Sequence, residues 1–184
     1  FKNFDLAEIA TMIDWSPFFQ TWDLAGAYPA ILQDEIVGEQ ARKVLADAQS
    51  MLQKVVQGRW LTANAVVGLY PANRVDCDDI ALFTDETRTQ KWLTWHGMRQ
   101  QTEKPVVEGK TMPSRCLADF VQTPEEGLDY VGMFAVTAGI GAEHRAAAFE
   151  AAHDDYNAIM LKSLADRLAE AFAELLHTKI RTDL

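Results

Sequence analysis

The stretch DWSPFFQTWDL, residues 14–24, places aromatic rings and carboxylates side by side near the start of the chain. Its four rings fall at positions i, i+3, i+4 and i+7: Trp15, Phe18, Phe19 and Trp22. This spacing is typical of one face of an α-helix. Ser16 is placed to act as the N-cap, with Pro17 as the first helical residue. The sequence therefore predicts a short helix whose rings lie in the core.

Asp14 stands directly before this predicted cap. A carboxylate at that point can accept hydrogen bonds from the free backbone N–H groups of the first helical turn. It can also pair with the ammonium group of a ligand. The residues alone leave both roles open.

Composition narrows the class of protein. The chain has 184 residues, of which 48% are hydrophobic, so we expect one domain, residues 1–184, with a substantial core. Its formal net charge of −10 is the wrong sign for a nucleic-acid partner. No apolar run is long enough to span a bilayer and the first residues do not resemble a secretory signal, which predicts a cytoplasmic protein with no membrane partner. Cys77 and Cys116 are far apart in sequence and favour idle or buried thiols.

The order of the apolar patterns indicates the fold class. A helical stripe covers residues 31–56, and another pattern is helical from Ala142 to the end. Between them, β-type runs predict strands at residues 65–75, 78–86, 116–121 and 129–139, with a strand passing into a helix at 89–100. We expect a hairpin at Asp76–Asp79, and a central position in the sheet for 129–139 because it is almost wholly apolar. The prediction is an α+β fold with helices on an antiparallel sheet.

Few residues suggest chemistry. Glu150 and His153 form a single Glu-x-x-His, which favours a boundary histidine over a metal site, and we expect no metal. No pattern indicates a nucleophilic hydrolase, so no catalytic residue is assigned. Three acids step by four along the last helix: Asp166, Glu170 and Glu174. They form either a solvated face or an acidic wall beside a cationic ligand or a basic partner.

Several long phrases carry a resemblance to a known family. In order along the chain they are DWSPFFQTWDLAG, GLYPANRVDCDDI, MRQQTEK, LADFV, FAVTAG and HDDYNAIMLKSLADRLAEAFAE. Together they resemble the activation domain of cobalamin-dependent methionine synthase. The resemblance implies a C-shaped α+β unit with a bent antiparallel sheet and flanking helices. It also implies that the domain binds S-adenosylmethionine and delivers its methyl group to cobalamin held by a neighbouring domain, with an electron from flavodoxin or an equivalent reductase.

The resemblance also assigns a residue. The aspartate of the family's D-W-[ST]-P-F-F motif binds S-adenosylmethionine, and its match is Asp14. The family's Arg-x-x-x-Gly-Tyr element does not occur before Leu184, so we expect this chain to be the N-terminal and central part of the domain, and inactive alone. Positioning of the reactants requires no general acid or base. The alternative is a non-catalytic acidic domain that docks on a partner protein, with Asp14 only capping a helix.

Overall fold

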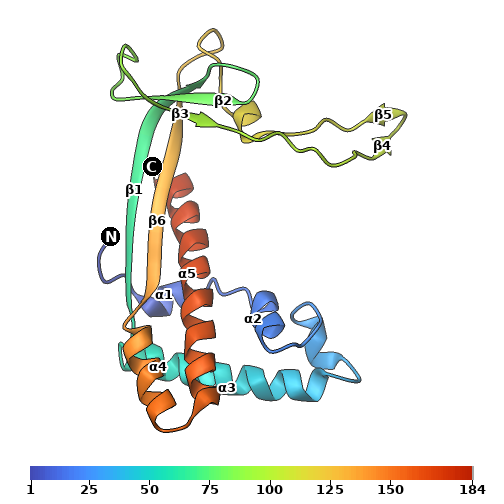
Figure 1. Cartoon of the computed structure of the whole chain (residues 1–184), viewed down its shortest axis with the longest axis vertical. Coiled ribbons are helices and arrows are strands. Elements are labelled where there is room, and N and C mark those ends of the chain that lie inside the picture. Colours follow the sequence, from blue (N-terminus) through green and yellow to red (C-terminus); the bar gives the residue numbers. More distant parts are fainter. Residues whose placement is uncertain (184) are drawn as a thin grey trace. The chain divides into compact units, whose positions relative to one another are not determined.

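The computed structural model describes residues 1–183 and has an α+β fold (Figure 1). Its internal contacts gather into two compact units. Unit 1 comprises Phe1–Val66 and Ala135–Leu184, and unit 2 comprises Val67–Phe134. The long strands β1 (Thr62–Arg74) and β6 (Asp129–Ile140) each contribute residues to both units.

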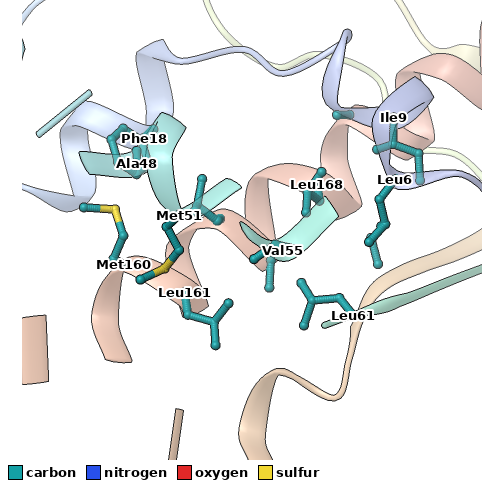
Figure 2. Close-up of a cluster of buried hydrophobic side chains, with 14 of the residues drawn as sticks. Leu6, Ile9, Phe18, Ala48, Met51, Val55, Leu61, Met160, Leu161 and Leu168 are labelled. Atoms are coloured by element: carbon teal, nitrogen blue, oxygen red, sulfur yellow. The ribbon is translucent and has the colours of Figure 1, made fainter. Parts of the chain in front are cut away.

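Unit 1 is mainly helical. Its elements are α1 (Leu6–Ala10), α2 (Ser16–Thr21), the 3₁₀ turn η1 (Ala30–Gln33), α3 (Gly38–Gln57), α4 (Ala142–Ala151) and α5 (Asp155–Asp183). The helices α1, α2 and α3 all pack against α5. Figure 2 shows the shared core, to which α5 contributes Met160, Leu161 and Leu168. Burial of these apolar side chains is the main force that holds the short α1 and α2 in place.

Two of the predicted helix boundaries are wrong. The helix expected over 31–56 begins only at Gly38, because the Asp34 carboxylate accepts hydrogen bonds from the backbone N–H groups of Ile36 and Val37 at 2.8 and 2.9 Å. These two bonds hold the pKa of Asp34 below its ordinary value. Side-chain bonds of this kind offer the backbone a turn in place of a helix.

The predicted C-terminal helix is interrupted. It ends at Ala151 and restarts at Asp155, because His153 takes a left-handed conformation with φ of 58°. Asp154 then accepts a hydrogen bond from the backbone N–H of Asn157 at 3.1 Å, which marks the start of α5.

Unit 2 contains most of the four-stranded sheet, whose order is β3-β2-β1-β6. The strands β2 (Asp79–Phe83) and β3 (Lys91–His96) pair antiparallel, and β1 pairs with β2 in the same sense. The register places Ala72 opposite Leu82, and Leu82 opposite Leu93. The predicted hairpin at residues 76–79 and the antiparallel sheet are confirmed. The short β4 (Val106–Val107) and β5 (Lys110–Thr111) form a separate exposed hairpin.

The central position predicted for residues 129–139 is wrong, because β6 lies at an edge of the sheet formed by the described residues. Its apolar composition does not reflect complete burial, since Tyr130 and Phe134 are 47% and 45% exposed.

The strand predicted at residues 116–121 is instead the 3₁₀ turn η2 (Leu117–Phe120). Its Asp119 carboxylate accepts a hydrogen bond from the Cys116 N–H at 2.9 Å and is paired with Arg99 at 2.7 Å. These contacts hold the pKa of Asp119 well below its usual range, with the Arg99 bonds as the larger cause. Arg99 also donates to the Ser114 carbonyl oxygen at 2.8 Å, and the helix expected to follow β3 does not form.

Candidate functional site

Asp14 lies in the link between α1 and α2 and is exposed. Its Oδ1 atom accepts a hydrogen bond from the Ser16 N–H at 2.9 Å. Among residues 1–183 its Oδ2 atom has no hydrogen-bond or ion-pair partner. The predicted acceptance of a backbone N–H at the start of α2 is thus confirmed, although Trp15 occupies the N-cap position and no side chain caps it.

Ser16 does not act as the N-cap that the sequence predicted. Its hydroxyl oxygen instead accepts a hydrogen bond from the Tyr28 N–H at 3.2 Å. Ser16 therefore lies between two segments: its own N–H is bound by the Asp14 carboxylate, and its side chain holds the turn that follows α2.

The aromatic face of α2 anchors this arrangement in unit 1. Phe18 and Phe19 are fully buried, as predicted, and Phe18 appears in the cluster of Figure 2. Trp15 and Trp22 are only partly buried and pack at the margin of the core. The Trp15 ring meets Phe18 edge-on, with 5.3 Å between centroids and an interplanar angle of 87°. Packing of this kind fixes α2, and with it the backbone that orients Asp14.

A tyrosine of α5 strengthens the attachment of α2. The ring of Tyr156 lies 5.0 Å from that of Trp22, and its hydroxyl donates a hydrogen bond to Asp47 Oδ2 at 2.8 Å. Burial, followed by the hydrogen bond to Asp47, raises the pKa of Tyr156 to about 12. The phenol is therefore neutral at physiological pH and stays a donor. The sequence pattern does not indicate this pair, because the two residues are 109 positions apart.

The turn after α2 is held by further contacts. The Leu24 N–H donates to the Phe19 carbonyl oxygen at 3.0 Å, and the Ile31 N–H donates to that of Ala27 at 2.9 Å. Gly26 has φ of +151°, and a Cβ there would lie 2.9 Å from the side chain of Ile31, so the turn has no room for a larger residue.

The acidic stripe of α5 is paired with a cation, Arg167, that the spacing of the acids does not indicate. Arg167 pairs with Asp166 at 2.7 Å and with Glu170 at 3.2 Å. The Arg167 side chain is only 10% exposed, whereas those of the two acids are 70% and 66% exposed. Glu174 is exposed and has no ion pair within the described part of the chain. Like charges four residues apart on a helix repel, and Arg167 offsets this repulsion for Asp166 and Glu170.

The other residues considered from the sequence do not form a site. His153 lies in the break between α4 and α5, so it does not share a helix face with Glu150. Residues 1–183 contain no group of three or more His, Cys, Asp or Glu that could hold a metal. Cys77 is exposed and Cys116 is buried, and both are free thiols. Over the same residues, no helix is long and apolar enough to cross a membrane.

Comparison with known proteins identifies the family. Residues 5–184 match the family described as "Vitamin B12 dependent methionine synthase, activation domain". The chain belongs to this family. The activation-domain resemblance inferred from the phrases of the sequence is thereby confirmed.

A solved structure agrees with this assignment. The chain is similar to the protein described as "Crystal Structure of the MetH Reactivation Domain bound to AdoHcy", with 50% sequence identity and a TM-score of 0.84. The match covers 98% of this chain and 54% of that one, so the activation-domain chain spans about half the length of its match. The predicted α+β fold is confirmed by the same comparison.

Proposed function

We propose that this activation-domain chain binds S-adenosylmethionine and presents its methyl group to cobalamin during reductive reactivation of methionine synthase. The observation that carries the proposal is Asp14, an exposed carboxylate on a fixed turn, one oxygen of which has no partner among residues 1–183. Membership of the family supports it, as does the similar MetH domain whose structure contains S-adenosylhomocysteine.

Asp14 suits the amino-acid end of the substrate. Its Oδ1 is engaged by the Ser16 N–H, which limits rotation of the carboxylate, and the residue is exposed. An α-ammonium group would form a charge-assisted hydrogen bond with Oδ2, a stronger type than a neutral one. Because the scaffold is set before the ligand arrives, little ordering is required on binding.

The proposed chemistry asks only for positioning from this chain. Cobalamin held by the neighbouring domain would supply, after one-electron reduction, the nucleophile for the methyl group, and S-adenosylhomocysteine would be the other product. The sulfonium is a good leaving group without protonation, so the protein needs no general acid or base. The role of the chain is to hold the substrate at its ammonium end and keep its methyl group accessible.

We propose as partners the cobalamin-binding domain of the same cytoplasmic enzyme and flavodoxin or an equivalent reductase. Residues 1–184 would form part of one activation domain in that longer protein. The acidic stripe Asp166, Glu170 and Glu174 would border the substrate pocket or serve as a docking surface, with Glu174 the acid most available for exchange because it lacks an ion pair among the described residues. Exposed ion pairs are weak and screened by salt, which suits reversible docking.

Calorimetric titration of the intact enzyme with S-adenosylmethionine tests the main proposal. We expect Asp14→Asn to weaken binding by about 1.5 to 3 kcal/mol, the range for a hydrogen bond to a charged group. Asp5→Asn is the matched control, because Asp5 is also exposed and caps α1 by accepting from the Ala7 N–H at the same distance, 2.9 Å. Equal effects of the two substitutions, or none, would reject a binding role for Asp14.

The alternative, an acidic docking domain without substrate binding, is favoured by one observation, the exposed carboxylates of α5. It predicts that the wild-type enzyme does not bind S-adenosylmethionine saturably. For the docking surface itself, Glu174→Gln should alter the salt dependence of reactivation while leaving methionine synthesis in primed turnover unchanged. An unchanged salt dependence would make the stripe an ordinary solvated face.

A further inference from the structure

Tyr28 is an exposed aromatic residue on the fixed turn after α2. Its side chain is stacked on buried Phe19, with 6.3 Å between ring centroids and an interplanar angle of 20°. Phe19 is fully buried while Tyr28 is 38% exposed. One face of the Tyr28 ring is therefore backed by the core, and much of the rest meets solvent.

Ser16 connects this ring to the proposed substrate site. The Ser16 N–H is bound by Asp14, and the Ser16 hydroxyl accepts from the Tyr28 N–H at 3.2 Å. Two hydrogen bonds through one residue thus join the Asp14 carboxylate to the backbone of the exposed tyrosine. Both groups lie within unit 1 and depend on the same buried aromatic anchor.

S-adenosylmethionine carries two cationic groups that the Asp14 carboxylate and the Tyr28 ring could each recognise. In S-adenosylmethionine the sulfonium is separated from the α-ammonium nitrogen by a chain of only three carbon atoms. A ligand whose ammonium is held at Asp14 places its sulfonium close by, within the reach of a neighbouring side chain. The face of an aromatic ring attracts a cation within about 6 Å of its centroid.

We propose that Tyr28 recognises the sulfonium cation of S-adenosylmethionine through its ring face, and so favours this substrate over the uncharged thioether product. The inference rests on the proposed function of Asp14 and adds a specificity residue to it. Asp14 contacts a group that substrate and product share, so it does not distinguish them. Tyr28 would contact the atom whose charge changes when the methyl group leaves, which assists release of the product.

The ratio of two affinities tests the inference. Titration of the intact enzyme with S-adenosylmethionine and with S-adenosylhomocysteine gives that ratio for wild type, Tyr28→Phe and Tyr28→Leu. We expect Tyr28→Leu to weaken binding of the sulfonium ligand about three- to tenfold, in keeping with a partly exposed cation–π contact, and to change binding of the thioether less than twofold. Tyr28→Phe retains the ring and should keep the wild-type ratio.

Fluorinated phenylalanines at position 28 give a second test that preserves ring shape. Each added fluorine withdraws electron density from the ring face, so affinity for S-adenosylmethionine should fall stepwise while affinity for S-adenosylhomocysteine stays level. Equal losses for both ligands, or no loss for either, would overturn the inference. Asp14→Asn should weaken both ligands alike, so failure of the Asp14 proposal is distinguishable from failure of the Tyr28 proposal.

Discussion

Phe18→Ala is the substitution that most directly tests how unit 1 holds Asp14. The Phe18 side chain is fully buried and its ring lies 5.3, 5.7 and 6.3 Å from those of Trp15, Phe19 and Trp22. Truncating a buried phenylalanine to alanine costs about 3 to 5 kcal/mol, because apolar contacts are lost and a cavity is left. The edge-on contact with Trp15 accounts for about 0.5 to 1.5 kcal/mol of such a loss.

Urea unfolding followed by tryptophan fluorescence and by circular dichroism measures this change. The matched control is Gln20→Ala on the same helix, because Gln20 is exposed and its replacement should change stability by less than about 0.5 kcal/mol. Trp15→Ala should cost less than Phe18→Ala, since Trp15 is only partly buried. A cost below about 1 kcal/mol for Phe18→Ala would refute the conclusion that the aromatic face of α2 anchors this part of the core.

Three further perturbations test other contacts. Arg99→Ala should reduce the loss of stability on acidification below about pH 4. Because the pKa of Asp119 is lower in the folded than in the unfolded chain, its carboxylate contributes stability that is present above the unfolded-state pKa and lost as pH falls. An unchanged pH profile of melting temperature would contradict this. Tyr156→Phe should flatten the fall in stability between pH 10 and 12, because the pKa of Tyr156, raised to about 12 in the folded chain, gives stability that is lost as pH rises. Ultraviolet titration of the variant should show one late-titrating phenol fewer than wild type. Gly97→Ala should lower the melting temperature far more than Gly139→Ala. A Cβ at Gly97 would lie 2.6 Å from the Cys116 sulfur and closer still to the Asp78 carbonyl oxygen, whereas the nearest atom to a Cβ at Gly139 is 3.6 Å away. Similar effects of the two substitutions would refute the close packing at Gly97.

Local patterns of apolar residues predicted several of the helices and strands. The rings at i, i+3 and i+4 predicted the helix of Phe18 and Phe19, and the β-type runs predicted the paired strands β1 and β2. The misplaced boundaries have a different origin, since they depend on single side chains that bind the backbone. Asp34 delays α3, and Asp119 turns residues 117–120 into a 3₁₀ helix.

The candidate site was predictable only in part. The motif around residue 14 indicated Asp14 as a candidate, and its hydrogen bond to the Ser16 N–H is local in sequence. Tyr28 and Arg167 were missed for different reasons. The contact of Tyr28 with Ser16 spans 12 residues and requires the folded turn, whereas Arg167 sits between two acids whose spacing alone was considered. The apolar pattern also did not predict the order of the strands, since an apolar strand such as β6 can lie at an edge of the sheet.

The crystal structure of the intact enzyme with bound S-adenosylmethionine tests the central claim most directly. The account predicts that Asp14 keeps its Oδ1 bond to the Ser16 N–H and that its Oδ2 lies about 2.7 to 2.9 Å from the α-ammonium nitrogen of the ligand, the range for a charge-assisted hydrogen bond. A ligand bound elsewhere, with Oδ2 of Asp14 still facing solvent, would contradict it.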